Sequence, residues 1–179
     1  MKAIEPIPQP PSPICWASNL GRCSKEDSRE HIVTESTLRG PQINIRGLPF
    51  LQGRTVTLHK SQFKANILCR THSNALSEVD KAGTVSFDWL RDAARPGTSQ
   101  FTINGTLLER WFLKTLINIE VVADFNIQPP LDIVEIAYGR KTFEPNAGSQ
   151  KNKVLKQRLS RDMNTTNRRT RIAAAISYY

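Results

Sequence analysis

Two side chains that bind zinc well stand close together in the tetrapeptide Cys69-Arg-Thr-His72. This spacing lets one turn of the chain present two ligands to a Zn²⁺ ion, which takes four ligands in a tetrahedral arrangement. Cys15 and Cys23 are the only other cysteines and complete such a set. We therefore predict a structural zinc site from these four residues, which requires the two parts of the chain to lie close together.

The same residues also have a simpler interpretation. The separation between Cys15 and Cys23 is longer than the roughly two to four residues between the ligands of a tight zinc knuckle. Cys69 follows Ile67 and Leu68 and can be a small buried hydrophobic residue, with His72 at the surface. An odd number of cysteines does not suit a disulfide framework, so metal binding and simple burial remain the two interpretations.

The apolar pattern predicts a mixture of helices and short strands. Thr106 to Glu120 is the strongest helix, and we assign its charged residues, Lys114 among them, to an outer face. Its predicted apolar residues are Leu108, Trp111, Phe112, Leu116 and Ile119. Leu131 to Tyr138 is expected to be a strand or a short helix, since Pro129 and Pro130 end regular structure before it.

The shorter elements are expected on both sides of the zinc tetrapeptide. Gln42 to Leu58 predicts short strands and turns, and Val85 to Leu90 and Gln100 to Ile103 predict two more strands. A short helix is expected within Thr71 to Asp80, ending before Gly83.

These elements predict one α+β domain with tails. Residues 1–13 contain five prolines and are expected to be a disordered lead. Residues 14–143 are expected to form the domain, with two short strands and a helix around residues 30–80 as its core and the 106–120 helix as an extension. Residues 144–179 are expected to be a linker and a basic tail.

The charge of the chain is concentrated in that tail. The chain has 25 basic and 16 acidic residues, a net charge of +9. Residues 151–179 hold eight basic residues and one acid, which leaves 9 − 7 = +2 for residues 1–150. An acidic partner such as DNA is therefore expected to contact the tail, although a solvated basic terminus is the alternative. The predicted contacts in the tail are Lys156, Arg158, Arg161, Arg168, Arg169 and Arg171.

The sequence contains no apolar run of about 18 residues, which argues against a membrane-spanning helix. The first 13 residues contain no apolar stretch of the kind found in a signal peptide. We therefore expect a cytoplasmic protein, without a small organic cofactor. No interface pattern indicates an oligomeric state.

Three stretches together resemble a known family. They are Ser28-Arg-Glu-His-Ile-Val, then Ser36-Thr-Leu-Arg-Gly, and after about thirty residues Leu68-Cys-Arg-Thr-His-Ser-Asn-Ala-Leu-Ser. Their order and spacing resemble the HNH endonucleases, which have the ββα-metal fold, and the resemblance spans roughly Cys15 to Asp80. It implies a nuclease that hydrolyses DNA phosphodiester bonds with one catalytic divalent ion, Mg²⁺, Mn²⁺ or Zn²⁺, beside the structural zinc.

The resemblance also implies roles for single residues. His31 stands in the place of the general base, and a neutral imidazole can take a proton from the attacking water. Glu30 stands in the place of the metal-binding acid, with Asn74 as a further ligand and Asp80 in reserve. The imidazole of His31 would need an acceptor that holds it in one tautomer, which the sequence does not identify.

This chain departs from the family pattern at several positions. Ser18 stands where the second cysteine of the first knuckle belongs, so zinc would have to recruit Cys23. Ser73 stands where the family has His or Asn, and His72 could serve the catalytic ion if no zinc binds. Asn66 is the nearest candidate for the middle residue of the family motif.

Two arginines of this region, Arg29 and Arg39, could contact phosphates, with solvated surface as the alternative. His59 has no motif around it and is expected to be structural or exposed.

Three functional hypotheses follow. The first is the metal-dependent DNA endonuclease. The second is a non-catalytic, zinc-stabilised module that binds nucleic acid or a protein. The third, a basic structural protein without metal, applies only if Cys69 and His72 lie far from Cys15 and Cys23.

Overall fold

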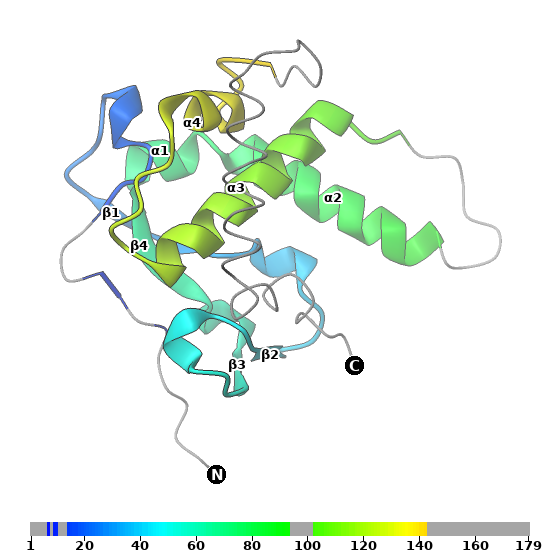
Figure 1. The fold of residues 1–179 in the computed structure, drawn as a ribbon. Coiled ribbons are helices and arrows are strands. Elements are labelled where there is room, and N and C mark those ends of the chain that lie inside the picture. The colour runs from blue at the N-terminus through cyan, green and yellow to red at the C-terminus, as the bar shows by residue number, and fades with distance from the viewer. Residues whose placement is uncertain (1–6, 8, 11–13, 94–101, 143–179) are drawn as a thin grey trace, which may run out of the picture.

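A computed structural model describes residues 7, 9–10, 14–93 and 102–142 of the chain. The fold is mixed α+β, as the sequence predicts (Figure 1). The strands are β1 (Asp27–His31), β2 (Gln42–Ile45), β3 (Val56–His59) and β4 (Lys64–Cys69). The α-helices are α1 (Arg70–Asn74), α2 (Ser77–Ala93), α3 (Gly105–Ala123) and α4 (Leu131–Ala137). Four short 3-10 helices are η1 (Ser18–Leu20), η2 (Glu35–Thr37), η3 (Pro49–Leu51) and η4 (Lys60–Gln62).

The strands form two separate antiparallel pairs. In the first pair, β1 lies beside β4, with Glu30 opposite Ala65 and His31 opposite Lys64. The second pair is β2 with β3, which confirms the strands and turns predicted between residues 42 and 58. Helix α1 begins directly after β4, so that the two strands of the first pair and this helix place the segments around residues 30 and 72 side by side.

Helix α2 is longer than the sequence predicted. Gly83 does not end it, and Val85 to Leu90, predicted as a strand, belongs to it. The reason is the packing of α2 against α3, because a Cβ atom at Gly83 would lie 2.3 Å from the indole of Trp111. This glycine thus provides space for a neighbouring side chain and does not break the helix. In the second predicted strand, Thr102 and Ile103 have no strand structure, and the remaining residues lie outside the described part.

Helix α3 confirms the predicted helix at residues 106–120, but its buried face differs from the predicted one. The side chain of Asn104 caps the helix by accepting a hydrogen bond from the backbone N–H of Leu107 at 3.1 Å. Phe112 and Leu116, predicted as core residues, are 49% and 58% exposed. The buried residues are Trp111, Lys114, Ile117, Asn118, Val121 and Val122. The prediction that Lys114 lies on an outer face is therefore wrong, because α3 packs against both α2 and β4 and buries the stripe that contains it.

One hydrophobic core joins the strand pair to the helices. Trp16, Ile67, Leu76 and Val121 belong to it although they are far apart in the sequence. The segment from Leu131 to Tyr138, expected to be a strand or a short helix, contains helix α4. This helix adds Val134 to the core.

Part of the predicted disordered lead is ordered against the domain. Ile7 is 5% exposed and belongs to the core. The side chain of Gln9 donates to the carbonyl of Lys64 at 3.1 Å and accepts from the backbone N–H of Asn66 at 3.0 Å. Gln9 therefore satisfies backbone groups of β4 that do not face β1.

The predicted basic tail, including Lys156, Arg158, Arg161, Arg168, Arg169 and Arg171, lies outside the described residues. Within the part of the chain that the structure describes, no helix has the length and apolar composition needed to cross a bilayer.

Candidate functional site

The first candidate site is the cluster of Cys15, Cys23, Cys69 and His72 predicted from the sequence. Each residue comes from a different local structure: Cys15 precedes η1, Cys23 lies in the loop before β1, Cys69 ends β4, and His72 lies in α1. Their ligand atoms all lie within 4.8 Å of one another. The hypothesis of a basic protein without metal required the two parts of this cluster to lie far apart, so the structure does not support it.

The geometry of this cluster fits a tetrahedral zinc ion. The Sγ atoms of Cys15 and Cys69 both lie 3.3 Å from Nδ1 of His72, and the Sγ atom of Cys23 lies 3.6 Å from it. A tetrahedral Zn²⁺ with Zn–S of about 2.3 Å and Zn–N of about 2.0 Å separates sulfur from nitrogen by about 3.5 Å. These four residues form a Cys₃His site that could hold a metal ion such as zinc.

The electrostatics of this site favour the thiolate at only one of its cysteines. Burial raises the pKa of the Cys69 thiol, but hydrogen bonds from the backbone N–H groups of His72 and Ser24 outweigh it, and the pKa is lowered to about 6. Burial raises the pKa of Cys15 to about 12 and also raises that of Cys23. A divalent ion would compensate the cost of ionising these two thiols, because metal binding releases their protons.

Two neighbours hold this site in place. Tyr138, just after α4, donates a hydrogen bond to the backbone carbonyl of His72 at 3.0 Å and packs edge-on against its ring. Burial raises the pKa of Tyr138, so the phenol stays a donor. Ser18 lines the groove beside the three cysteines but does not belong to the cluster, whereas Cys23 does. The cluster thus contains Cys23, as predicted from the sequence.

The second candidate site is a cleft of about 580 Å³ between β1, η2, α1 and the start of α2. Four of the predicted site residues line this cleft together: Glu30, His31, Asn74 and Asp80. Arg29 lines it as well, whereas Arg39 and Asn66 are not among its lining residues. His59 is exposed and caps η4, in agreement with its expected structural role.

His31 has the acceptor that the sequence did not identify. Its Nε2 atom lies 2.8 Å from Oε2 of Glu35. A carboxylate only accepts, so Nε2 carries the proton and Nδ1 is the nitrogen that can take one up. Burial and the ammonium group of Lys64 lower the pKa of His31, although Glu35 raises it. The imidazole is therefore neutral near pH 7, as a general base needs to be.

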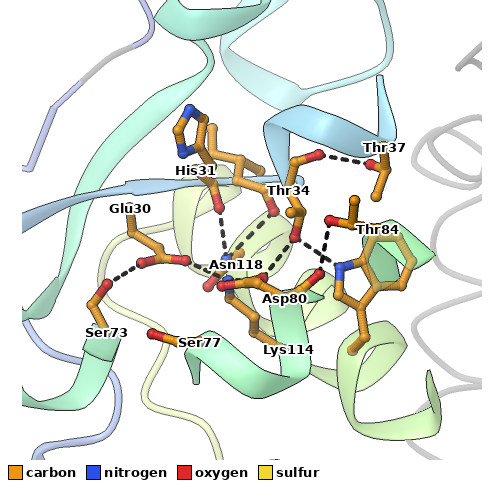
Figure 2. Close-up of polar contacts among 12 residues, drawn as sticks. Glu30, His31, Thr34, Thr37, Ser73, Ser77, Asp80, Thr84, Lys114 and Asn118 are labelled. Atoms are coloured by element: carbon orange, nitrogen blue, oxygen red, sulfur yellow. Dashed lines mark hydrogen bonds and ion pairs between the residues drawn. The ribbon is translucent and has the colours of Figure 1, made fainter. Parts of the chain in front are cut away.

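The backbone at His31 is fixed by a buried asparagine on α3. The side-chain amide of Asn118 donates to the carbonyl of His31 at 3.1 Å (Figure 2). Its oxygen accepts from the indole N–H of Trp16 at 3.0 Å, and the asparagine is fully buried. Asn118 thus connects the end of β1 to Trp16, the residue that follows Cys15 of the Cys₃His cluster.

The two predicted metal-binding acids meet at Lys114. Its Nζ atom lies 2.5 Å from Oε1 of Glu30 and 2.6 Å from Oδ1 of Asp80. The other oxygen of Glu30 accepts from the hydroxyl of Ser73 at 2.6 Å, and Oδ1 of Asp80 also accepts from Thr34 at 2.6 Å (Figure 2). These oxygens already have donors, so this arrangement does not fit a divalent ion bound between the two carboxylates.

Sequence reasoning missed Lys114 as a site residue, although a signal was present. Lys114 follows Trp111 by three residues and precedes Ile117 by three and Val121 by seven, which places it on their face of the helix. A lysine inside an apolar stripe requires a buried partner, because an unpaired buried charge is costly. The sequence does not say which acid that partner is.

No protein-family model, curated protein or solved structure matches this chain. The two sites themselves are therefore the guide to the function of this chain.

Proposed function

We propose that this chain is a zinc-stabilised nuclease that hydrolyses DNA phosphodiester bonds in the cleft, with His31 as the general base. The observation that carries this proposal is the contact between His31 and Glu35. It leaves Nδ1 of a neutral imidazole as the proton acceptor in an open cleft.

In this proposal, Nδ1 of His31 takes a proton from a water molecule, and the resulting hydroxide attacks the phosphorus atom. The bond between phosphorus and the 3′ oxygen breaks, the 3′ oxygen leaves and takes a proton from solvent, and the imidazolium of His31 returns its proton to solvent. Glu35 keeps the imidazole in the required tautomer and stabilises the imidazolium that forms. Arg29 and Lys60 line the same cleft and are suited to contact the non-bridging oxygens of a phosphate. The divalent ion that the family resemblance implies has no step in this scheme, because Lys114 already pairs with its expected ligands.

The Cys₃His cluster has a structural role in the proposal. All four of its ligands come from protein side chains, which leaves no open position of the kind that a catalytic zinc uses. Zinc there would tie the segment around Cys15 and Cys23 to the end of β4 and the start of α1. Ser73, which contacts Glu30 in the cleft, follows one of these ligands directly.

A second candidate is the non-catalytic module that binds nucleic acid or a protein. The observation that favours it is the pairing of Lys114 with Glu30 and Asp80, which leaves the cleft without the two acids expected to bind the catalytic ion.

A plasmid-nicking assay separates the two candidates. Zinc-loaded full chain is incubated with supercoiled DNA without added metal, with Mg²⁺ and with Mn²⁺. We expect nicking by the wild type, and a loss of roughly 100-fold or more in His31→Ala, because a general base contributes about that much. His59→Ala is the matched control, since this histidine is exposed and outside the cleft. DNA binding without nicking in all three conditions would support the module, and equal nicking by His31→Ala would refute the role of His31.

A further inference from the structure

Lys114 is the most deeply buried charged group of the cleft region. Its side chain is 2% exposed, and that of Glu30 is 6% exposed. Asp80, at 28%, is the more open of its two partners. A buried ammonium of this kind is stable only when it is paired and hydrogen-bonded.

The ammonium group of Lys114 contacts three carboxylate oxygens. An ammonium group has three N–H donors. Nζ of Lys114 lies 2.5 Å from Oε1 of Glu30, 2.6 Å from Oδ1 of Asp80 and 2.8 Å from Oδ2 of Asp80. Figure 2 shows the lysine below the two carboxylates, which converge on it from β1 and α2. The charge of the lysine therefore serves the two acids.

The two carboxylates are also held in place from other directions. Ser28 donates to Ser73 at 3.0 Å, and Ser73 donates to Glu30. On the other side, the indole of Trp111 donates to Thr34 at 2.8 Å, and Thr34 donates to Asp80. These hydrogen bonds help to hold the two acids toward the position of Nζ in addition to the contacts that Lys114 makes.

Oxygen ligands that converge in this way suit a hard divalent cation as well as an ammonium group. Both cannot be present, because they would use the same oxygens and repel each other. We infer that Lys114 is the resident cation of this cleft, and that a divalent ion binds between Glu30 and Asp80 only when the ammonium group is removed. Lys114 is thus a positioning residue: it holds Glu30 and Asp80 in place without a divalent ion bound from solution.

The test is a titration of the zinc-loaded full chain with Mn²⁺, followed by the electron paramagnetic resonance of free Mn²⁺. Mn²⁺ suits oxygen ligands and binds more weakly than Zn²⁺ at a thiolate site, so it does not displace the zinc. We expect Lys114→Ala to bind one Mn²⁺ roughly 10- to 100-fold more tightly than the wild type. Lys114→Ala/Asp80→Asn should lose this gain.

Two controls separate the removal of this particular ammonium group from a general change in charge. Lys60→Ala removes one positive charge from the lining of the same cleft and should bind Mn²⁺ like the wild type. Lys114→Arg keeps the charge and should also show no gain.

Thermal unfolding gives a second readout that also serves for a folded variant of reduced stability. A ligand that binds only the folded state raises the midpoint of unfolding. Mn²⁺ should therefore raise the midpoint of Lys114→Ala and leave that of the wild type unchanged. The inference is overturned if wild-type protein binds Mn²⁺ and Asp80→Asn abolishes this binding, or if Lys114→Ala shows no gain in either readout. Neither readout depends on cleavage of DNA.

Discussion

The Nε2 atom of His31 lies 2.8 Å from Oε2 of Glu35, four residues further along the chain. This contact joins the end of β1 to the first residue of η2, and both side chains line the cleft. It gives a partner to the one histidine of the cleft, and it determines which ring nitrogen can accept a proton.

The first prediction concerns this contact. Glu35→Gln should reduce nicking by roughly 10- to 100-fold, less than His31→Ala, because a residue that orients a base usually contributes that much. The reason is that an amide can present either a donor or an acceptor and no longer enforces one tautomer. Plasmid nicking under the conditions used for His31→Ala measures the effect. Glu26→Gln, an exposed glutamate paired with Arg70, is the matched control and should nick normally.

The second prediction concerns the titration of His31. Burial and Lys64, its register neighbour on β4, lower the pKa of this imidazole. Lys64→Met should raise the pKa of His31, and Glu35→Gln should lower it further, because it removes a charge that favours the imidazolium. NMR titration of the imidazole resonances measures both changes. Lys141→Met, at the surface after α4, should leave the pKa of His31 unchanged. A fall of that pKa in Lys64→Met would contradict the electrostatic explanation.

The third prediction concerns the Cys₃His cluster. Purified protein should contain one zinc ion per chain, and Cys15→Ser should lose it, because a hydroxyl is a poor ligand for zinc. Loss of a structural metal should lower the free energy of unfolding by more than about 4 kcal/mol. Elemental mass spectrometry and urea denaturation measure the two effects. Ser18→Ala, in the same groove, should keep both the zinc and the stability. Zinc retained by Cys15→Ser would remove Cys15 from the ligand set.

The fourth prediction concerns Asn118. Asn118→Ala should lower the free energy of unfolding by about 2–4 kcal/mol, because it leaves the buried indole N–H of Trp16 and the carbonyl of His31 without their partner. Urea denaturation measures the loss. Asn126→Ala, at an exposed asparagine beyond α3, should cost less than about 1 kcal/mol. Equal costs at the two positions would mean that these hydrogen bonds do not contribute to stability.

The fifth prediction concerns the contact between α2 and α3. Gly83→Ala should lower the free energy of unfolding by about 1–3 kcal/mol, since the new methyl group would overlap the indole of Trp111. Helix propensity alone predicts the opposite sign, because alanine favours a helix over glycine by about 1 kcal/mol. Gly105→Ala at the start of α3 has open space around the new atom and should be neutral or stabilising. Thermal or urea unfolding of both variants decides between packing and propensity.

Local chemistry was enough to predict part of this protein. Ligand type and spacing predicted the set of Cys15, Cys23, Cys69 and His72, because zinc accepts few kinds of side chain and needs four of them. Apolar periodicity predicted the existence of α3 and of the strands between residues 42 and 58. The helix and the strands depend on neighbouring residues, and tertiary contacts changed them little. The metal-ligand set could be predicted for another reason, because the chain offers only three cysteines.

Tertiary structure decided the rest. Periodicity showed that α3 is amphipathic, but two helical stripes were available, and contacts with α2 and β4 selected the one that contains Lys114. In the same way, Gly83 stays within a helix because Trp111, far away in the sequence, needs the space that a side chain would fill. The pairing of Lys114 with Glu30 and Asp80 joins three elements whose acids and base are distant along the chain. Residue types and their spacing indicated which side chains could bind metal or accept a proton. Packing determined which charged groups pair with one another, because a buried charge without a partner is too costly.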